Sequence, residues 1–131
     1  EPELVAGGLA FPNGVAVAPD GNSIRVAEFA AKRILWIPTR HSTLQFNVPH
    51  VFAHTTGGVG PDGLTFDDDG VLYAANIEAG TVSRWTPQGT PLPDLTLPPE
   101  AGLLVTKVLV EQRWLYVTEA AQGAVWRVRL D

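Results

Sequence analysis

"PDGLTFDDDGVLYAANIEAGTVSRW", residues 61–85, occurs in two further recognisable copies along the chain. An earlier copy, "PNGVAVAPDGNSIRVAEFAAKRILWI", covers residues 12–37, and a later one, "VTKVLVEQRWLYVTEAAQGAVWRV", covers residues 105–128. Repeats spaced by about 45 residues are typical of the four-stranded blades of a β-propeller. The sequence therefore predicts an all-β protein of three four-stranded blades, which is half of a six-bladed propeller.

Within each copy, apolar runs of strand length alternate with turn signals such as Asp-Gly. With 11 prolines, 13 glycines and no long apolar face of helical period, the chain does not favour helices. The blade copies are expected at 12–53, 61–97 and 105–128. Their predicted strands, from inner to outer, are A at 14–18, 63–66 and 105–110, B at 24–28, 71–76 and 114–119, C at 33–37, 81–85 and 124–128, and D at 50–53 and 94–97.

Composition excludes several classes of protein. A net charge of −5 argues against a nucleic-acid surface, which needs clustered lysine and arginine. The longest apolar runs are far too short to span a bilayer, and no secretory signal is visible. Because the chain has no cysteine, it has no disulfide framework and no thiolate chemistry. The absence of cysteine is compatible with any cellular compartment.

The ten residues 61–70 hold two separate acidic groups at opposite ends of a predicted hairpin strand. Asp67, Asp68 and Asp69 precede a glycine and are expected to form the A–B turn, where Asp and Gly supply local hydrogen bonds and positive φ. They lack the spaced oxygens of a calcium loop. Because strands A and B are antiparallel, Asp62 is expected at the other edge, beside the propeller axis.

Several oxygen-bearing side chains share that inner edge with Asp62. Its counterparts in the other copies are Asn13 and Thr106. A ring of carboxylate, amide and hydroxyl oxygens around an axial channel suits a hard cation, although Asn13 and Asp62 alternatively cap a turn after proline. The channel rim is completed by three residues at the ends of the B strands, Glu28, Asn76 and Glu119.

"LAFPNGVAVAPDGNSIRVAEFAAKRILWI" (9–37) and "GPDGLTFDDDGVLYAANIEAGTVSRW" (60–85) resemble the gluconolactonase and regucalcin (senescence marker protein) family, and more distantly strictosidine synthase-like proteins. The resemblance covers nearly the whole chain but only the second half of that six-bladed propeller. It implies a divalent cation, usually calcium, bound by Asn13 and Asp62. It also implies that Asp62 is the general base or nucleophile of lactone hydrolysis.

The third copy departs from the family pattern, because Thr106-Lys107 stands where the earlier copies have Asn-Gly and Asp-Gly. Lys107 is expected to be a solvated lysine at the blade edge, with assistance to an anionic intermediate as the alternative. The family's first-blade glutamate ligand and the residues that grip its sugar lactone have no counterpart here. An ion held by Asn13 and Asp62 alone would be under-coordinated.

Three blades are too few to close a propeller ring. The segment "ELVA", residues 3–6, reads as an outer strand, and the third copy lacks one. We therefore expect a head-to-tail homodimer with six blades, in which each chain's residues 3–6 complete the other's third blade. The alternative is a piece of a longer protein.

Two functions from different classes follow from these patterns. One is a metal-dependent, lactonase-like hydrolase of lactones or esters that works as a six-bladed assembly. The other is a non-catalytic half-propeller that binds a ligand or partner and has lost the first-half catalytic groups. In either case the four tryptophans are expected to pack between blades: Trp36, Trp85, Trp114 and Trp126.

Overall fold

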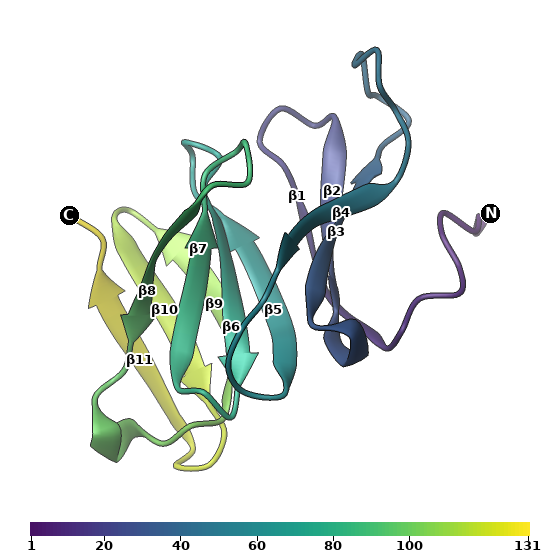
Figure 1. Cartoon of the computed structure of the whole chain (residues 1–131). Coiled ribbons are helices and arrows are strands. Elements are labelled where there is room, and N and C mark those ends of the chain that lie inside the picture. Colours follow the sequence, from purple (N-terminus) through teal and green to yellow (C-terminus); the bar gives the residue numbers. More distant parts are fainter.

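The computed structural model describes all 131 residues and consists of three antiparallel sheets that stand side by side, with the second between the other two (Figure 1). Each sheet is one blade, and its strands follow the chain in order from inner to outer. The first blade contains β1 (Pro12–Val17), β2 (Ser23–Glu28), β3 (Arg33–Pro38) and β4 (His50–His54); the second contains β5 (Gly60–Phe66), β6 (Leu72–Ile77), β7 (Thr81–Trp85) and β8 (Pro91–Thr96); the third contains β9 (Val105–Glu111), β10 (Trp114–Glu119) and β11 (Ala124–Arg129).

The predicted all-β propeller architecture is confirmed. The only helices are two single 3-10 turns, Phe29–Ala31 and Pro99–Ala101, and no helix has the length and hydrophobicity that crossing a membrane requires. The third blade lacks an outer strand, as expected. Residues 3–6 form no strand in the single chain, and the N-terminus extends away from the first blade (Figure 1), so their exchange with a second chain stays a prediction.

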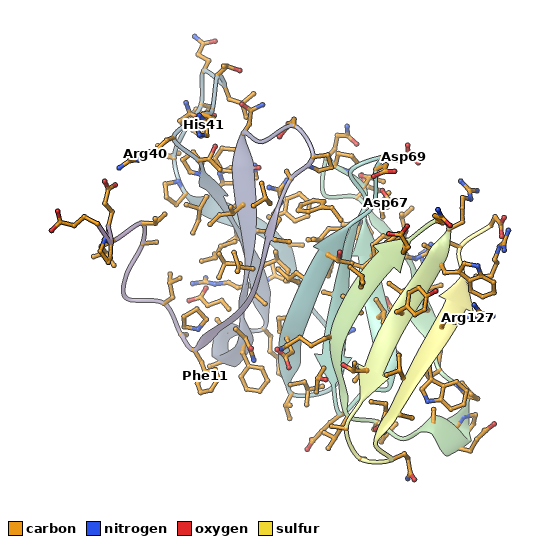
Figure 2. The ribbon with its side chains drawn as sticks, turned by 180° about the vertical axis from the view of Figure 1, so that it is seen from behind. Phe11, Arg40, His41, Asp67, Asp69 and Arg127 are labelled. Atoms are coloured by element: carbon orange, nitrogen blue, oxygen red, sulfur yellow. The ribbon has the colours of Figure 1, made fainter.

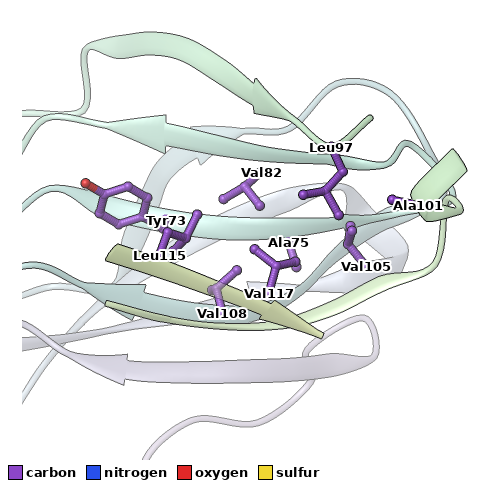
Figure 3. Close-up of a cluster of buried hydrophobic side chains, with 9 residues drawn as sticks. All are labelled: Tyr73, Ala75, Val82, Leu97, Ala101, Val105, Val108, Leu115 and Val117. Carbon is purple, nitrogen blue, oxygen red and sulfur yellow. The ribbon is translucent and has the colours of Figure 1, made fainter. Parts of the chain in front are cut away.

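Apolar side chains fill the two joints between neighbouring blades. The joint between the first two blades contains Ile34, Leu72 and Trp85. The joint between the second and third blades is larger (Figure 3). Only the second blade is packed on both faces, and its strand β6 is accordingly buried over almost its whole length. The larger joint is lined by Tyr73, Ala75, Val82, Leu97, Ala101, Val105, Val108, Leu115 and Val117.

Glycines let the inner strands of consecutive blades touch. A Cβ atom on Gly14 would lie 2.1 Å from the carbonyl oxygen of Asp62. A Cβ atom on Gly63 would lie 2.7 Å from both the Cα of Lys107 and the carbonyl oxygen of Thr106. The glycine of each P-N-G or P-D-G motif is therefore required by close backbone contact with the next blade.

We expect Gly14→Ala to lower the free energy of unfolding by about 1–3 kcal/mol, because the new methyl group must push two inner strands apart. Chemical denaturation measures the change. Gly7→Ala is the matched control, since a Cβ atom there meets nothing closer than Leu4 Cδ2 at 3.9 Å. Equal stabilities of the two variants would contradict the proposed strand contact.

The outer flanks of the first and third blades remain uncovered in the single chain. Val15 and Val17 of β1 are each 61% exposed, although Ala6 and Leu9 cover part of that flank. On the third blade, Leu109 is 59% and Val125 68% exposed. Exposed apolar patches of this kind mark surfaces that pack against something else.

Candidate functional site

Each inner strand carries a β-bulge in its first residues. The pairing of β1 with β2 runs from Pro12↔Glu28 to Val15↔Val26, so Asn13 and Gly14 face a single partner residue. The same irregularity interrupts β5 at Asp62 and Gly63 and β9 at Thr106. Bulges re-aim side chains and are common beside functional sites. Together with the glycine contacts, they bring the starts of three consecutive blades together at one edge.

Asp62 is a buried carboxylate at this edge, with a residue exposure of 6%. Lys107 reaches it from the next blade, and its Nζ donates a hydrogen bond of 2.6 Å to Asp62 Oδ1. The lysine side chain is 61% exposed, whereas that of Asp62 is 8% exposed. Asp62 Oδ2 takes part in no hydrogen bond within the chain. The edge therefore presents an ion pair with one free carboxylate oxygen.

Two polar residues neighbour this ion pair, and they differ in whether their side chains are already hydrogen-bonded. Asn13 is exposed and makes no side-chain hydrogen bond. Thr106 Oγ1 lies 2.8 Å from Thr118 Oγ1, and the same Thr118 oxygen accepts the backbone N–H of Lys107 at 3.0 Å. Asn13 is thus the available polar side chain beside Asp62, while Thr106 is tied into its own blade.

Two of the predicted rim residues at the ends of the B strands are buried, and their carboxylates accept hydrogen bonds from loop backbone. Glu28 accepts the backbone N–H of Ala10 at 2.8 Å and pairs with Arg33 at 2.5 Å. Glu119 accepts the backbone N–H groups of Leu104 and Gln122. To contact a ligand, either carboxylate would have to leave these hydrogen bonds, so their role at the rim stays a prediction.

Asn76, the third of these residues, is fully buried in the second blade. Its Nδ2 donates to Thr81 Oγ1 at 3.0 Å and to Ser83 Oγ at 2.7 Å. Its Oδ1 is buried without a hydrogen-bond partner. The amide therefore braces β6 against β7, and its predicted role at the channel rim also stays a prediction.

The two buried glutamates predict how stability depends on pH. The hydrogen bond from Arg33 holds the pKa of Glu28 below its ordinary value, and the backbone N–H of Gln122 does the same for the pKa of Glu119. A carboxylate with a lowered folded-state pKa stabilises the fold above the unfolded-state pKa of about 4.3 and loses that contribution as the pH falls through the lowered value.

We therefore expect the melting temperature of the protein to fall between about pH 5 and about pH 3. Glu119→Gln should reduce this dependence, because the neutral side chain does not titrate. Glu78→Gln is the control, since Glu78 is exposed and makes no side-chain hydrogen bond. Identical pH profiles for Glu119→Gln and the wild type would contradict this assignment.

The crowded acidic residues lie at the opposite edge, as predicted. Figure 2 shows Asp67 and Asp69 at one end of the blades and Phe11, just before β1, at the other. Asp67 Oδ1 accepts the backbone N–H groups of Asp69 and Val71, and its Oδ2 accepts the Tyr73 hydroxyl at 2.9 Å. A hollow of about 410 Å³ lies beside this turn, and Asp62 does not line it. The acidic turn is a structural element of the hairpin.

The side chains of a single chain do not fit a calcium ion. Calcium takes six to eight oxygen ligands, and the chain brings together no group of three or more acidic, histidine or cysteine side chains that could hold a metal. The carboxylate of Asp62 is already neutralised by Lys107. The predicted ligand pair of Asn13 and Asp62 therefore needs donors from outside this chain.

A β-propeller with a carboxylate, a lysine and an amide at the axial ends of its inner strands is the class of protein that this fold and site define. More narrowly, the chain belongs to the family described as the SMP-30/Gluconolactonase/LRE-like region, which matches residues 2–121. The resemblance predicted from the P-N-G and P-D-G strand starts is confirmed.

Two curated relatives are lactonases. The chain is 27% identical over 127 residues to a 6-deoxy-6-sulfogluconolactonase of Pseudomonas putida, covering 92% of this chain and 42% of that protein. It is 30% identical over 95 residues to lactonase drp35 of Staphylococcus saprophyticus, covering 69% of this chain and 28% of the relative. The chain therefore spans less than half the length of either protein.

Solved structures share the fold. A calcium-binding protein, regucalcin, from Agrobacterium tumefaciens superposes with a TM-score of 0.76 at 21% identity. The match covers 95% of this chain and 47% of the regucalcin chain. At this identity the similarity establishes the common architecture of blades.

Proposed function

We propose that the protein hydrolyses lactones or related esters at Asp62, in an assembly that completes the propeller. The observation that carries this proposal is the buried Asp62 carboxylate, aimed by a β-bulge at the inner edge, with Oδ2 free and Lys107 on Oδ1. Membership of a gluconolactonase family and two lactonase relatives support the choice of reaction.

In the proposed reaction Asp62 acts as the general base. Oδ2 takes a proton from water while the water oxygen attacks the ester carbonyl carbon, and the carbonyl π electrons move onto the carbonyl oxygen. When the tetrahedral intermediate collapses, the bond from that carbon to the ring oxygen breaks. The released alkoxide takes the proton from Asp62, which regenerates the carboxylate and leaves a hydroxy acid.

We propose weaker binding of a divalent cation than the family resemblance implies. A divalent ion, calcium by analogy with the regucalcin relative, would contact Asn13 and Asp62 and would supply Lewis-acid polarisation of the ester. Because Lys107 neutralises Asp62, we expect only weak binding of calcium to the wild-type chain.

Substrate class is tested by titrating acid release at constant pH from gluconolactone, a small aliphatic lactone and a linear ester. We expect the protein to open at least one lactone well above the rate in buffer, because the water-activating carboxylate is already in place. The same titration with heat-denatured protein is the control. No acceleration with any of these esters would favour a binding module over a hydrolase.

We also propose that the open flanks are covered by a second copy of the chain. The exposed valines of β1 and the exposed apolar residues of the third blade support this arrangement. The joint between chains must be wider than the other two at the inner edge, because Lys107 stands where they have Gly14 and Gly63.

Light scattering at micromolar concentration should give twice the mass of the chain, and deletion of residues 1–6 should weaken the association. A monomer would overturn the second copy as the covering partner, and the remainder of a longer protein would take its place. A dimer unaffected by the deletion would contradict the exchange of residues 3–6 but would leave the dimer itself standing.

A further inference from the structure

Lys107 stands at a position of the repeat that is glycine in the first two blades, at the same edge of the blades as Asp62. In the first two blades, the corresponding residues are Gly14 and Gly63, whose Cβ positions are filled by the backbone of the next blade. The third copy instead carries a long side chain at this position, Lys107, which is 61% exposed in the single chain. That side chain turns back across the inner edge to the second blade, where its Nζ meets Asp62 Oδ1 at 2.6 Å.

The ammonium group holds one of the two oxygens that the Asp62 carboxylate can offer to a cation. Asp62 is the one carboxylate here whose oxygens are not committed to loops, since Glu28 and Glu119 hold backbone N–H groups. The ion pair is already neutral, so a divalent ion must either displace the lysine or lie beside a like charge. Both routes weaken binding.

We propose that the Lys107 ammonium takes the place of the divalent cation beside Asp62, which disfavours calcium and makes Lys107 the electrophilic catalytic residue. The catalytic part rests on the proposed hydrolase function. An ammonium group has three N–H donors, and Asp62 engages one of them. The others can donate to the ester carbonyl oxygen.

As water attacks the carbonyl carbon, the negative charge that develops on that oxygen lies beside a fixed positive charge, where it is stabilised most. The ammonium keeps its protons throughout. Proton transfer from water to Asp62 and on to the leaving alkoxide therefore balances without any contribution from Lys107. The site then needs no metal ion for this step.

Calcium titration calorimetry tests the binding part directly. Lys107→Met, which removes the charge but keeps an unbranched side chain, should bind calcium about fivefold more tightly than the wild type, as expected when a competing ion pair with an exposed lysine is removed. Lys107→Arg should stay as weak as the wild type. Lys32→Met is the matched control, because it removes the only other lysine, which donates to the carbonyl oxygen of Gly58.

Tight calcium binding by the wild type that Lys107→Met leaves unchanged would overturn the proposal. Equal weak binding by all four proteins would also overturn it, because removal of the lysine would then have uncovered no cation site. Thermal unfolding of each variant checks that the fold is retained, as expected for a side chain that is 61% exposed.

Activity supplies a second readout. Lactone opening by the wild type should survive a chelator, whereas Lys107→Met should be inactive with chelator and partly restored by added calcium. Loss of wild-type activity on chelation would contradict the catalytic role of Lys107. If no protein opens lactones but Lys107→Met still gains calcium affinity, the hydrolase function fails while Lys107 as the occupant of the cation site stands.

Discussion

Asp62→Asn should lower kcat/KM for lactone opening by about a hundredfold to ten-thousandfold, the range typical of losing a general base. The amide has nearly the volume of the carboxylate, so the packing of the inner strands is kept. It is a poor base, and it removes the charge that holds Lys107 in place. Initial rates over a range of lactone concentrations give the ratio.

Asp68→Asn is the matched control for this variant. It makes the same chemical change in the same hairpin, but Asp68 is exposed and makes no side-chain hydrogen bond in the turn at the opposite edge. We expect its kcat/KM to stay within about twofold of the wild type, as usual for surface changes. If Asp68→Asn proved the damaging change, the functional site would lie at the edge of the acidic turn and not at the edge of Asp62.

Leu109→Glu should abolish the proposed dimer at micromolar concentration. Leu109 of β9 pairs with Tyr116 of β10 and is exposed on the open flank of the third blade. A carboxylate buried there without a partner raises the dissociation constant by about a hundredfold or more. The monomer fold should be unaffected, because Leu109 is 59% exposed in the single chain. Sedimentation velocity measures the change in mass.

Phe46→Glu is the control for the flank. Phe46 is 72% exposed but lies between β3 and β4, outside either flank, so the same change there should leave the dimer intact. Loss of the dimer in both variants would indicate association through general surface hydrophobicity. A dimer that tolerates Leu109→Glu would place the interface elsewhere.

The repeat predicted the blades because it carries local signals. Apolar runs and Asp-Gly turns specify each hairpin within some ten residues, and all eleven strands form in the expected order. The boundaries were less predictable. β5 begins at Gly60, before the predicted 63–66, because the bulge at Asp62 and Gly63 lets pairing continue past the motif. β8 begins at Pro91, which an outer edge strand tolerates.

Contacts between blades could not be predicted from local patterns. The pair of Asp62 and Lys107 joins residues 45 positions apart, and its only sequence signal is the lysine that replaces a repeated glycine. Arg25 was missed altogether. It is buried against the ring of Phe52, 4.3 Å from the ring centre, and burial lowers its pKa to about 10. Such a side chain reads as an ordinary exposed charge in the sequence, because Phe52 of the outer strand and Phe66 of the next blade lie far from it along the chain.

The tryptophans illustrate the same limit. Trp36 and Trp85 are buried, and Trp126 packs against the second joint, as expected. Trp114 instead lies on the open flank of the third blade, under the guanidinium groups of Arg127 and Arg129. Within the single chain Trp114 does not lie between two blades, so its packing against a further blade stays a prediction.

The most direct test of hydrolysis by the pair of Asp62 and Lys107 is a single measurement on the wild-type protein. Proton nuclear magnetic resonance resolves a lactone from its hydroxy acid, so ring opening can be followed in a chelator-treated sample against buffer alone. We predict a rate well above that of buffer, in proportion to protein concentration. A rate equal to that of buffer would contradict the claim that this carboxylate and lysine open lactones without a metal ion.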